Sequence, residues 1–193
     1  QLRDAFAFAK FSAGDMPATL RLGKHALVWG ESLFFAANGI AGAQSPFDIT
    51  RLLADPTAQA KEFVLPVNQV SGQIQLTPDV TIGAYYQFDW VRNTFPSVGS
   101  FLSQSDIFGY GAENMWVVPG MAVARGDDRR PKDSGQGGVQ IRWNALDTDF
   151  GLYALRFHDK TAQIVTRLGM FNPAPGVFHA APTGYYQAFH QGT

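Results

Sequence analysis

Histidine and serine are the residue types in this chain that could carry out nucleophilic chemistry. A serine and a histidine on adjacent strands could act as a lipase pair, and Ser71 with an inward-facing His25 would be the candidates. The sequence contains no Gly-x-Ser-x-Gly elbow, His-Glu-x-x-His helix, phosphate loop or Gly-x-Gly-x-x-Gly turn. Isolated histidines in barrels more often form hydrogen bonds inside the lumen. We therefore expect a protein without enzymatic activity or catalytic residues.

Two charged segments contain residue types that bind cations or phosphates. Asp147-Thr148-Asp149 has the composition of a metal site, but it stands where a two-residue turn is needed, and Asp is a favoured turn residue. Residues 125–133 mix Arg, Lys and Asp. They could bind divalent cations or lipopolysaccharide phosphates, but we favour a solvated cluster whose charges neutralise one another. The chain has 0 Cys, which excludes thiolate ligands, and we expect neither a metal nor a cofactor.

Two alternating segments, 68–77 and 80–90, face each other across the short turn 77–79. Their even-numbered residues, such as Ile82, are mostly apolar, and their odd-numbered residues, such as Gln73, are mostly polar. A period of two predicts strands. Each segment has about the 9–11 residues that cross a bilayer at a tilt. The pattern predicts a membrane hairpin with apolar side chains outward and polar ones toward a lumen. A soluble hairpin with one solvated face is the alternative.

The composition favours the membrane interpretation. Charged residues make up 16% of the chain and aromatic residues 13%, against about 25% charged residues in an average soluble domain. The mean hydropathy of -0.09 and the lack of a long apolar run argue against a transmembrane helix. Membrane β-barrels combine such hydropathy with many aromatic residues. The net charge of -1 gives no electrostatic reason to expect nucleic acid as a partner.

The lengths of the connections also follow the pattern of outer-membrane barrels, which have short periplasmic turns and long external loops. We expect strands at 2–11, 19–30, 68–77, 80–90, 138–146 and 149–158, with 185–189 as a further candidate. Long loops are expected at about 31–67, 91–137 and 159–184. The predicted fold class is all-β, an antiparallel transmembrane β-barrel with a short helix in a long loop. Six strands do not close such a barrel, so residues 1–193 are expected to be one segment of a longer barrel chain.

The parity of each strand assigns side chains to the lumen or to lipid. A lipid-facing Arg near the midplane would cost about 2–4 kcal/mol, so the arginines are placed inside. In the last strand, Gly151, Tyr153 and Leu155 are assigned outward, and in the first, Phe6 and Phe8 are assigned to lipid. The side chains expected to line the lumen are Arg21, His25, Trp29, Gln73, Gln75, Tyr85, Gln87, Gln140, Arg142 and Arg156.

The segment 45–63 carries the signals of a helix within a long loop. Ser45 and Asp48 resemble a capping box with Pro46 at the first helical position, and the helix is expected to break at Pro56 and resume at 58–63. It could lie outside as a cap, but we expect it to fold toward the lumen as a constriction. The residues assigned to this constriction are Phe47, Asp48, Arg51, Leu52 and Glu62.

Several short stretches, taken in order, resemble an uncharacterised family of Gram-negative outer-membrane proteins with domain of unknown function 1302. They are 2–5, 21–24 leading to 28–32, 45–48 with 61–62, 86–90 and 131–137. Family members usually carry Asn-Pro where this chain has Ser45-Pro46, and Arg-Gln where it has Lys24-His25. The resemblance implies an outer-membrane β-barrel longer than this chain, suspected of moving apolar compounds, with no established substrate and no catalytic residues.

We therefore expect a non-enzymatic outer-membrane channel or transporter for small apolar or amphipathic compounds. Its expected partners are outer-membrane lipids, lipopolysaccharide and a small-molecule solute; a second copy or a cell-envelope protein stays open as a partner. A soluble all-β ligand-binding module is the main alternative, and an outer-membrane lipase is a weaker one. The solute, the direction of transport and the number of strands do not follow from the sequence.

Overall fold

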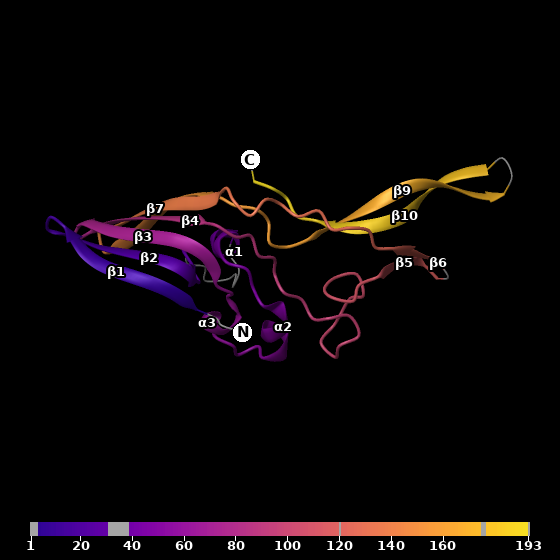
Figure 1. Cartoon of the computed structure of the whole chain (residues 1–193), viewed down its shortest axis with the longest axis horizontal. Coiled ribbons are helices and arrows are strands. Elements are labelled where there is room, and N and C mark those ends of the chain that lie inside the picture. Colours follow the sequence, from indigo (N-terminus) through magenta and orange to yellow (C-terminus); the bar gives the residue numbers. More distant parts are fainter. Residues whose placement is uncertain (1–3, 31–38, 120, 175–176, 193) are drawn as a thin grey trace.

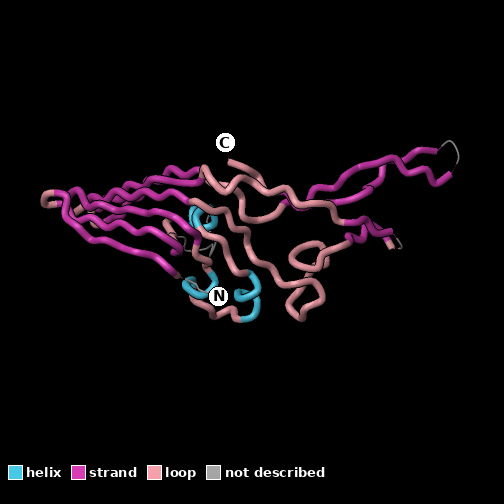
Figure 2. Tube along the Cα trace, viewed as in Figure 1, coloured by secondary structure: helices cyan, strands magenta, loops and turns pink. Residues whose placement is uncertain are grey.

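The computed structural model describes residues 4–30, 39–119, 121–174 and 177–192. Figure 1 shows a twisted sheet on one side of the molecule, short helices next to it, and a long hairpin that extends in the opposite direction. Figure 2 shows that strands account for both of these parts, with long loops between them. Of the helices described, none is both long and apolar enough to cross a membrane.

The main sheet has six strands, and every neighbouring pair is antiparallel. Their order is β1-β2-β3-β4-β7-β8, which follows the sequence. The strands are β1 (Ala5–Ala13), β2 (Met16–His25), β3 (Val67–Thr77), β4 (Val80–Gln87), β7 (Gln136–Ala145) and β8 (Thr148–Arg156). The predicted all-β, antiparallel class is therefore confirmed. The fourth strand ends at Gln87 instead of 90, since Trp90 is buried beyond it, packed edge-on against Phe189 at 4.7 Å between ring centroids.

Short turns join the strands at one end of the sheet and long connections join them at the other (Figure 1). Gly14-Asp15 and Leu146-Asp147 are two-residue turns. Gly14, Leu146 and Asp147 all have positive φ, of 69°, 54° and 55°. Such φ values fit the tight hairpin turns whose twist matches that of the strands. The connections 26–66 and 88–135 leave from the opposite end.

The described part of the first long connection contains three short helices: α1 (Gly39–Gln44), α2 (Ile49–Ala54) and α3 (Ala60–Phe63). Asp48 caps α2, because its carboxylate accepts a hydrogen bond from the backbone N–H of Arg51 at 3.1 Å. The predicted capping role of Ser45 is wrong. Its hydroxyl instead donates to the carbonyl of Leu27 at 2.8 Å, which ties the middle of the connection to its beginning.

The other two long connections contain further strands. The second holds the small hairpin β5 (Asn114–Val118) and β6 (Met121–Ala124). The third was expected to be a loop at 159–184, and this is wrong: it forms the hairpin β9 (Gln163–Ala174) and β10 (Val177–Ala188). Consecutive β-branched residues at 164–166 favour the extended conformation. This segment lacks the clean alternation that marked the other strands.

The two faces of the main sheet have opposite character. One face carries apolar side chains that are largely exposed, among them Leu22 (54% exposed), Val139 (50%) and Leu152 (62%). The other face carries polar side chains that are buried, including Gln69, Gln87, Gln136 and Gln140. In a soluble protein the apolar face would normally be the buried one.

Candidate functional site

A row of buried glutamines crosses the polar face of the sheet. Gln69, Gln87 and Gln136 lie opposite one another on β3, β4 and β7. The side-chain amide of Gln87 donates to the side-chain oxygen of Gln69 at 3.2 Å, and that of Gln69 donates to the carbonyl of His25 at 2.8 Å. Buried amides need such partners, because an unpaired polar group costs about 1–3 kcal/mol. The row links three strands and the end of β2.

The segment formed by residues 27–29 and helix α1 covers this polar face, and we call it the inner segment. The side-chain oxygen of Gln44 accepts a hydrogen bond from the backbone N–H of Trp29. The carbonyl of Gln44 accepts one from the side-chain amide of Gln87 on the sheet. Trp29 also packs edge-on against Tyr85, with ring centroids 4.9 Å apart. The inner segment is therefore fixed to the wall through both its backbone and its side chains.

Lys160, which follows β8, makes a second attachment for the inner segment. Its side chain is 4% exposed, and its ammonium group donates to the carbonyl of Ala43 at 2.6 Å and to the side-chain oxygen of Gln136 at 3.4 Å. Burial lowers the pKa of Lys160 to about 8, although the nearby Asp159 opposes this shift. No motif or periodicity around Lys160 predicts this role.

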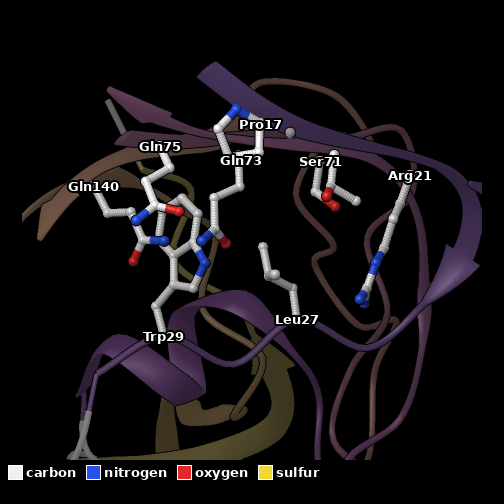
Figure 3. A pocket seen from close by; sticks show the side chains of 10 residues that line it. Pro17, Arg21, Leu27, Trp29, Ser71, Gln73, Gln75 and Gln140 are labelled. Atoms are coloured by element: carbon white, nitrogen blue, oxygen red, sulfur yellow. The ribbon is translucent and has the colours of Figure 1, made fainter. Parts of the chain in front are cut away.

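A groove of about 300 Å³ lies between the polar face and the inner segment. Figure 3 shows Arg21 at one end of it, Ser71 and Leu27 in the middle, and Trp29 with three glutamines at the other end. These glutamines are Gln73, Gln75 and Gln140. The groove thus offers a cation, an apolar surface and a cluster of neutral amides.

Next to the groove, His25 and Ser71 form the hydrogen bond that a lipase pair would need. The Nδ1 atom of His25 lies 3.1 Å from the carbonyl of Gly23, so the ring donates from Nδ1. Nε2 is then an acceptor, and the Ser71 hydroxyl donates to it at 2.8 Å. A backbone carbonyl therefore orients the ring, where a catalytic triad has a carboxylate. Both side chains are buried, at 1% and 7% exposure.

The structure brings together most of the side chains that the sequence assigned to the lumen. Arg21, Trp29, Gln73, Gln75 and Gln140 line the groove. His25, Tyr85 and Gln87 lie on the same face beside it, as the strand register requires. Arg142 also shares this face, opposite Thr81, but it lies nearer the short turns and outside the groove.

The prediction for Arg156 is wrong. The register of β7 and β8 places Arg156 opposite Gly137, on the exposed apolar face, and places Tyr153 opposite Gln140, on the polar face. Because side chains alternate along a strand, the outward assignment of Gly151, Tyr153 and Leu155 inverts every position of β8. Trp29 and Tyr153 meet at 6.4 Å between ring centroids, which also puts this strand's aromatic ring inside.

The assignment of Phe6 and Phe8 to lipid is also wrong. They lie opposite Gly23 and Arg21, on the polar face. The ring of Phe6 contacts His25 at 5.5 Å between centroids, and the Arg21 guanidinium carbon lies 5.7 Å from the centre of the Phe6 ring. This register gives Lys10 the polar face as well, and the outer face of β1 carries alanines and Phe11.

The predicted constriction residues lie at the end of the sheet with the long connections. Phe47 is buried with Ala41, Phe63 and Val64 in a small apolar cluster, and Leu52 packs against that cluster. Asp48 caps α2, which has no buried residue, and Arg51 forms an exposed ion pair with Glu62 at 3.6 Å. Backbone hydrogen bonds join residues 47–49 to Thr94. The part that covers the polar face is the inner segment, and the small residues of Gly39–Gln44 allow its close approach.

Within the charged run at 125–133, Arg125 pairs with Asp128, which also pairs with Arg92 outside the run. Asp128 accepts two hydrogen bonds from Arg125, at 3.2 and 2.6 Å, and one from Arg92 at 3.4 Å. It also accepts one from the backbone N–H of Gln187, which joins this run to β10. Within the described part of the chain, no group of three or more His, Asp or Glu side chains is placed to hold a metal ion.

The chain was compared with protein-family models, curated proteins and solved structures. The model of a family described as a protein of unknown function, DUF1302, matches residues 1–192. A search of curated proteins found no match. A search of solved structures found none either.

Proposed function

The chain belongs to this family of proteins of unknown function, and we propose that it forms part of an outer-membrane β-barrel that passes small apolar or amphipathic compounds without modifying them. The observation that carries the proposal is the inverted character of the main sheet. Its apolar face is exposed, and its polar face carries buried polar side chains, among them Gln69, Gln87 and Gln136. Contiguous exposed apolar surface marks contact with a membrane or a partner, and strands with apolar-out, polar-in alternation are typical of membrane barrels.

The aromatic side chains support the same orientation. On the exposed face, Trp143 and Phe150 stack at 5.3 Å near the short turns, and Tyr86 and Phe88 pack at 5.7 Å near the long connections. Membrane barrels carry aromatic girdles at both interfaces. The short turns would then face the periplasm. The long connections, with the hairpin β9–β10, would face the outside, where lipopolysaccharide is the neighbouring lipid.

Closure of the barrel requires more strands than this sheet contains. Within the described residues, β1 and β8 each pair on one side only. An open edge in lipid would leave backbone groups unpaired, at a cost of several kcal/mol each. Further strands of the same polypeptide or of a second copy must therefore pair with these edges.

The inner segment supplies the constriction in this proposal. It covers the polar wall from within, and Trp29 and Gln44 fasten it there. A solute would pass between this segment and the wall, along the groove that Arg21 and the glutamines line. The helices α2 and α3 then act as a cap at the outer end.

Spin labels on the full-length protein in lipid vesicles test the barrel. Labels at Ile82 and Ile141 should be shielded from aqueous quenchers and open to oxygen. Labels at Gln73 and Gln75, on the opposite face, should show the reverse. If the glutamine positions proved to be the lipid-exposed ones, the proposed orientation would be wrong.

Conductance in planar bilayers tests the transport function. The full-length protein should form pores, and Trp29→Ala should raise their conductance, because it removes the ring that packs against the wall. Deletion of residues 46–63 should change conductance less, since that segment lies at the outer end. A folded barrel without any conductance or solute flux would contradict the channel.

A further inference from the structure

We propose that the groove beside Arg21 is a recognition site for a small organic anion, a carboxylate attached to an apolar body. The inference rests on the proposed function, because it takes the polar face as the wall of a solute path. It adds the chemical class of the solute and the residue that selects it.

The charge of Arg21 is the first argument. Arg21 is exposed on the polar face, and the ion pairs found among the described residues use Arg51, Arg92 and Arg125 instead. The guanidinium carbon of Arg21 lies over the ring of Phe6, 5.7 Å from the ring centre. An aromatic ring packed against the flat face of a guanidinium group holds that group in one orientation. The N–H groups at the edge of the guanidinium stay available for hydrogen bonds to a ligand. Such a fork matches the two oxygens of a carboxylate.

The shape of the groove is the second argument. Its volume of about 300 Å³ is at the lower end of ligand pockets, so the ligand must be small. From Arg21 the groove continues past Leu27 to the indole ring of Trp29 (Figure 3). A carboxylate bound at Arg21 would therefore lay its apolar body against these two side chains. The glutamine amides at the far end could accept or donate one further hydrogen bond.

The pair formed by Ser71 and His25 favours binding over catalysis. The Ser71 hydrogen is engaged by Nε2 of His25, so the hydroxyl oxygen presents its lone pairs to the groove. That arrangement suits a hydroxyl donor of the ligand. It would also suit a nucleophile, but the ring is oriented by a carbonyl and not by a carboxylate, which leaves a developing imidazolium without its usual stabilisation.

Calorimetry on the full-length protein in detergent tests the site, with cyclohexanecarboxylate and the neutral cyclohexanecarboxamide as probes. Hydrogen bonds to charged groups contribute about 1.5–3 kcal/mol, so the carboxylate should bind at least about tenfold more tightly than the amide. Arg21→Gln should remove this preference, and Arg21→Lys should retain part of it. Arg156→Gln removes the same charge from the opposite face of the same sheet and should leave the preference unchanged.

Three outcomes would overturn the proposal. The first is equal binding of the two probes to the unaltered protein, and the second is a preference that survives Arg21→Gln in a folded protein. The third is hydrolysis of the methyl ester of the probe that is lost in Ser71→Ala, since it would replace recognition with catalysis. If only the proposed barrel were wrong, the spin labels at Ile82 would lie in water, but the preference for the carboxylate would persist. The two failures can therefore be told apart.

Discussion

The substitution Ile82→Arg tests directly whether the apolar face of the main sheet lies in lipid. Ile82 is near the middle of β4 and lies between Ile74 of β3 and Ile141 of β7 on that face. In a bilayer, Arg on the lipid side near the midplane costs about 2–4 kcal/mol. This cost corresponds to a decrease of roughly 30-fold to 1,000-fold in the folding equilibrium constant. On a face exposed to water, the same substitution would change the stability by at most about 0.5 kcal/mol.

Equilibrium unfolding of the full-length protein in urea, with phospholipid vesicles present, would give these free energies. Gln73→Arg is the matched control, because Gln73 is exposed on the polar face between Thr19 and Gly83. It should stay within about 0.5 kcal/mol of the unaltered protein. Equal and small effects of the two substitutions, or a larger effect at Gln73, would refute the assignment of the faces.

Three further substitutions test the attachments of the sheet. Because burial lowers the pKa of Lys160 to about 8, the unfolded chain binds more protons than the folded one above that pH. The free energy of unfolding should therefore rise by about 2 kcal/mol between pH 8 and 10, and Lys160→Met should abolish the rise. Asp128→Asn removes the negative charge and one of the two oxygens that accept hydrogen bonds from Arg125, and should accelerate hydrogen exchange in β6 and β10 by about 10- to 100-fold, but not in β3. Gly23→Ala should lower the stability by about 1–3 kcal/mol, since φ is +126° and the new methyl would lie 2.6 Å from a β1 carbonyl oxygen. Gly72→Ala, whose methyl would meet nothing closer than 3.6 Å, should be far milder in the same urea titration.

The faces of β8 could have been predicted from the turn that precedes it. A two-residue turn pairs an odd-numbered residue with an even-numbered one, as in the pairing of Ala145 with Thr148. Since Arg142 was assigned to the lumen, its neighbour Trp143 had to face outward. Its partner Phe150 had to be outward as well, and Arg156 with it. The uncharged residues Gly151, Tyr153 and Leu155 suggested that their own face of β8 is the outward one. The geometry of the hairpin outweighs that local pattern. The same geometry, applied to Gly14-Asp15, places Phe6 and Phe8 inward.

The inner segment could not have been predicted in this way. Gly39–Gln44 is short and composed mostly of small residues, so it carries no periodicity that would assign it to a wall. Its position depends on contacts across large separations in sequence, such as the hydrogen bond from Lys160 to Ala43. A lysine after a strand normally predicts a solvated side chain. Only the folded arrangement shows that this one is buried and holds α1.

Beneath the inner segment, the polar face of the main sheet carries neutral amide side chains. Their lack of charge suits a position that is buried. A charged side chain taken out of water costs several kcal/mol unless it is fully paired. A glutamine can donate and accept without carrying a charge. The amide of Gln87 donates to Gln69 and to the carbonyl of Gln44 in the inner segment, and the amide of Gln69 donates to the carbonyl of His25. Arg21 is instead exposed, where the groove is open. The amides thus hold the inner segment where water is excluded, and the cation stands where an anionic solute would enter.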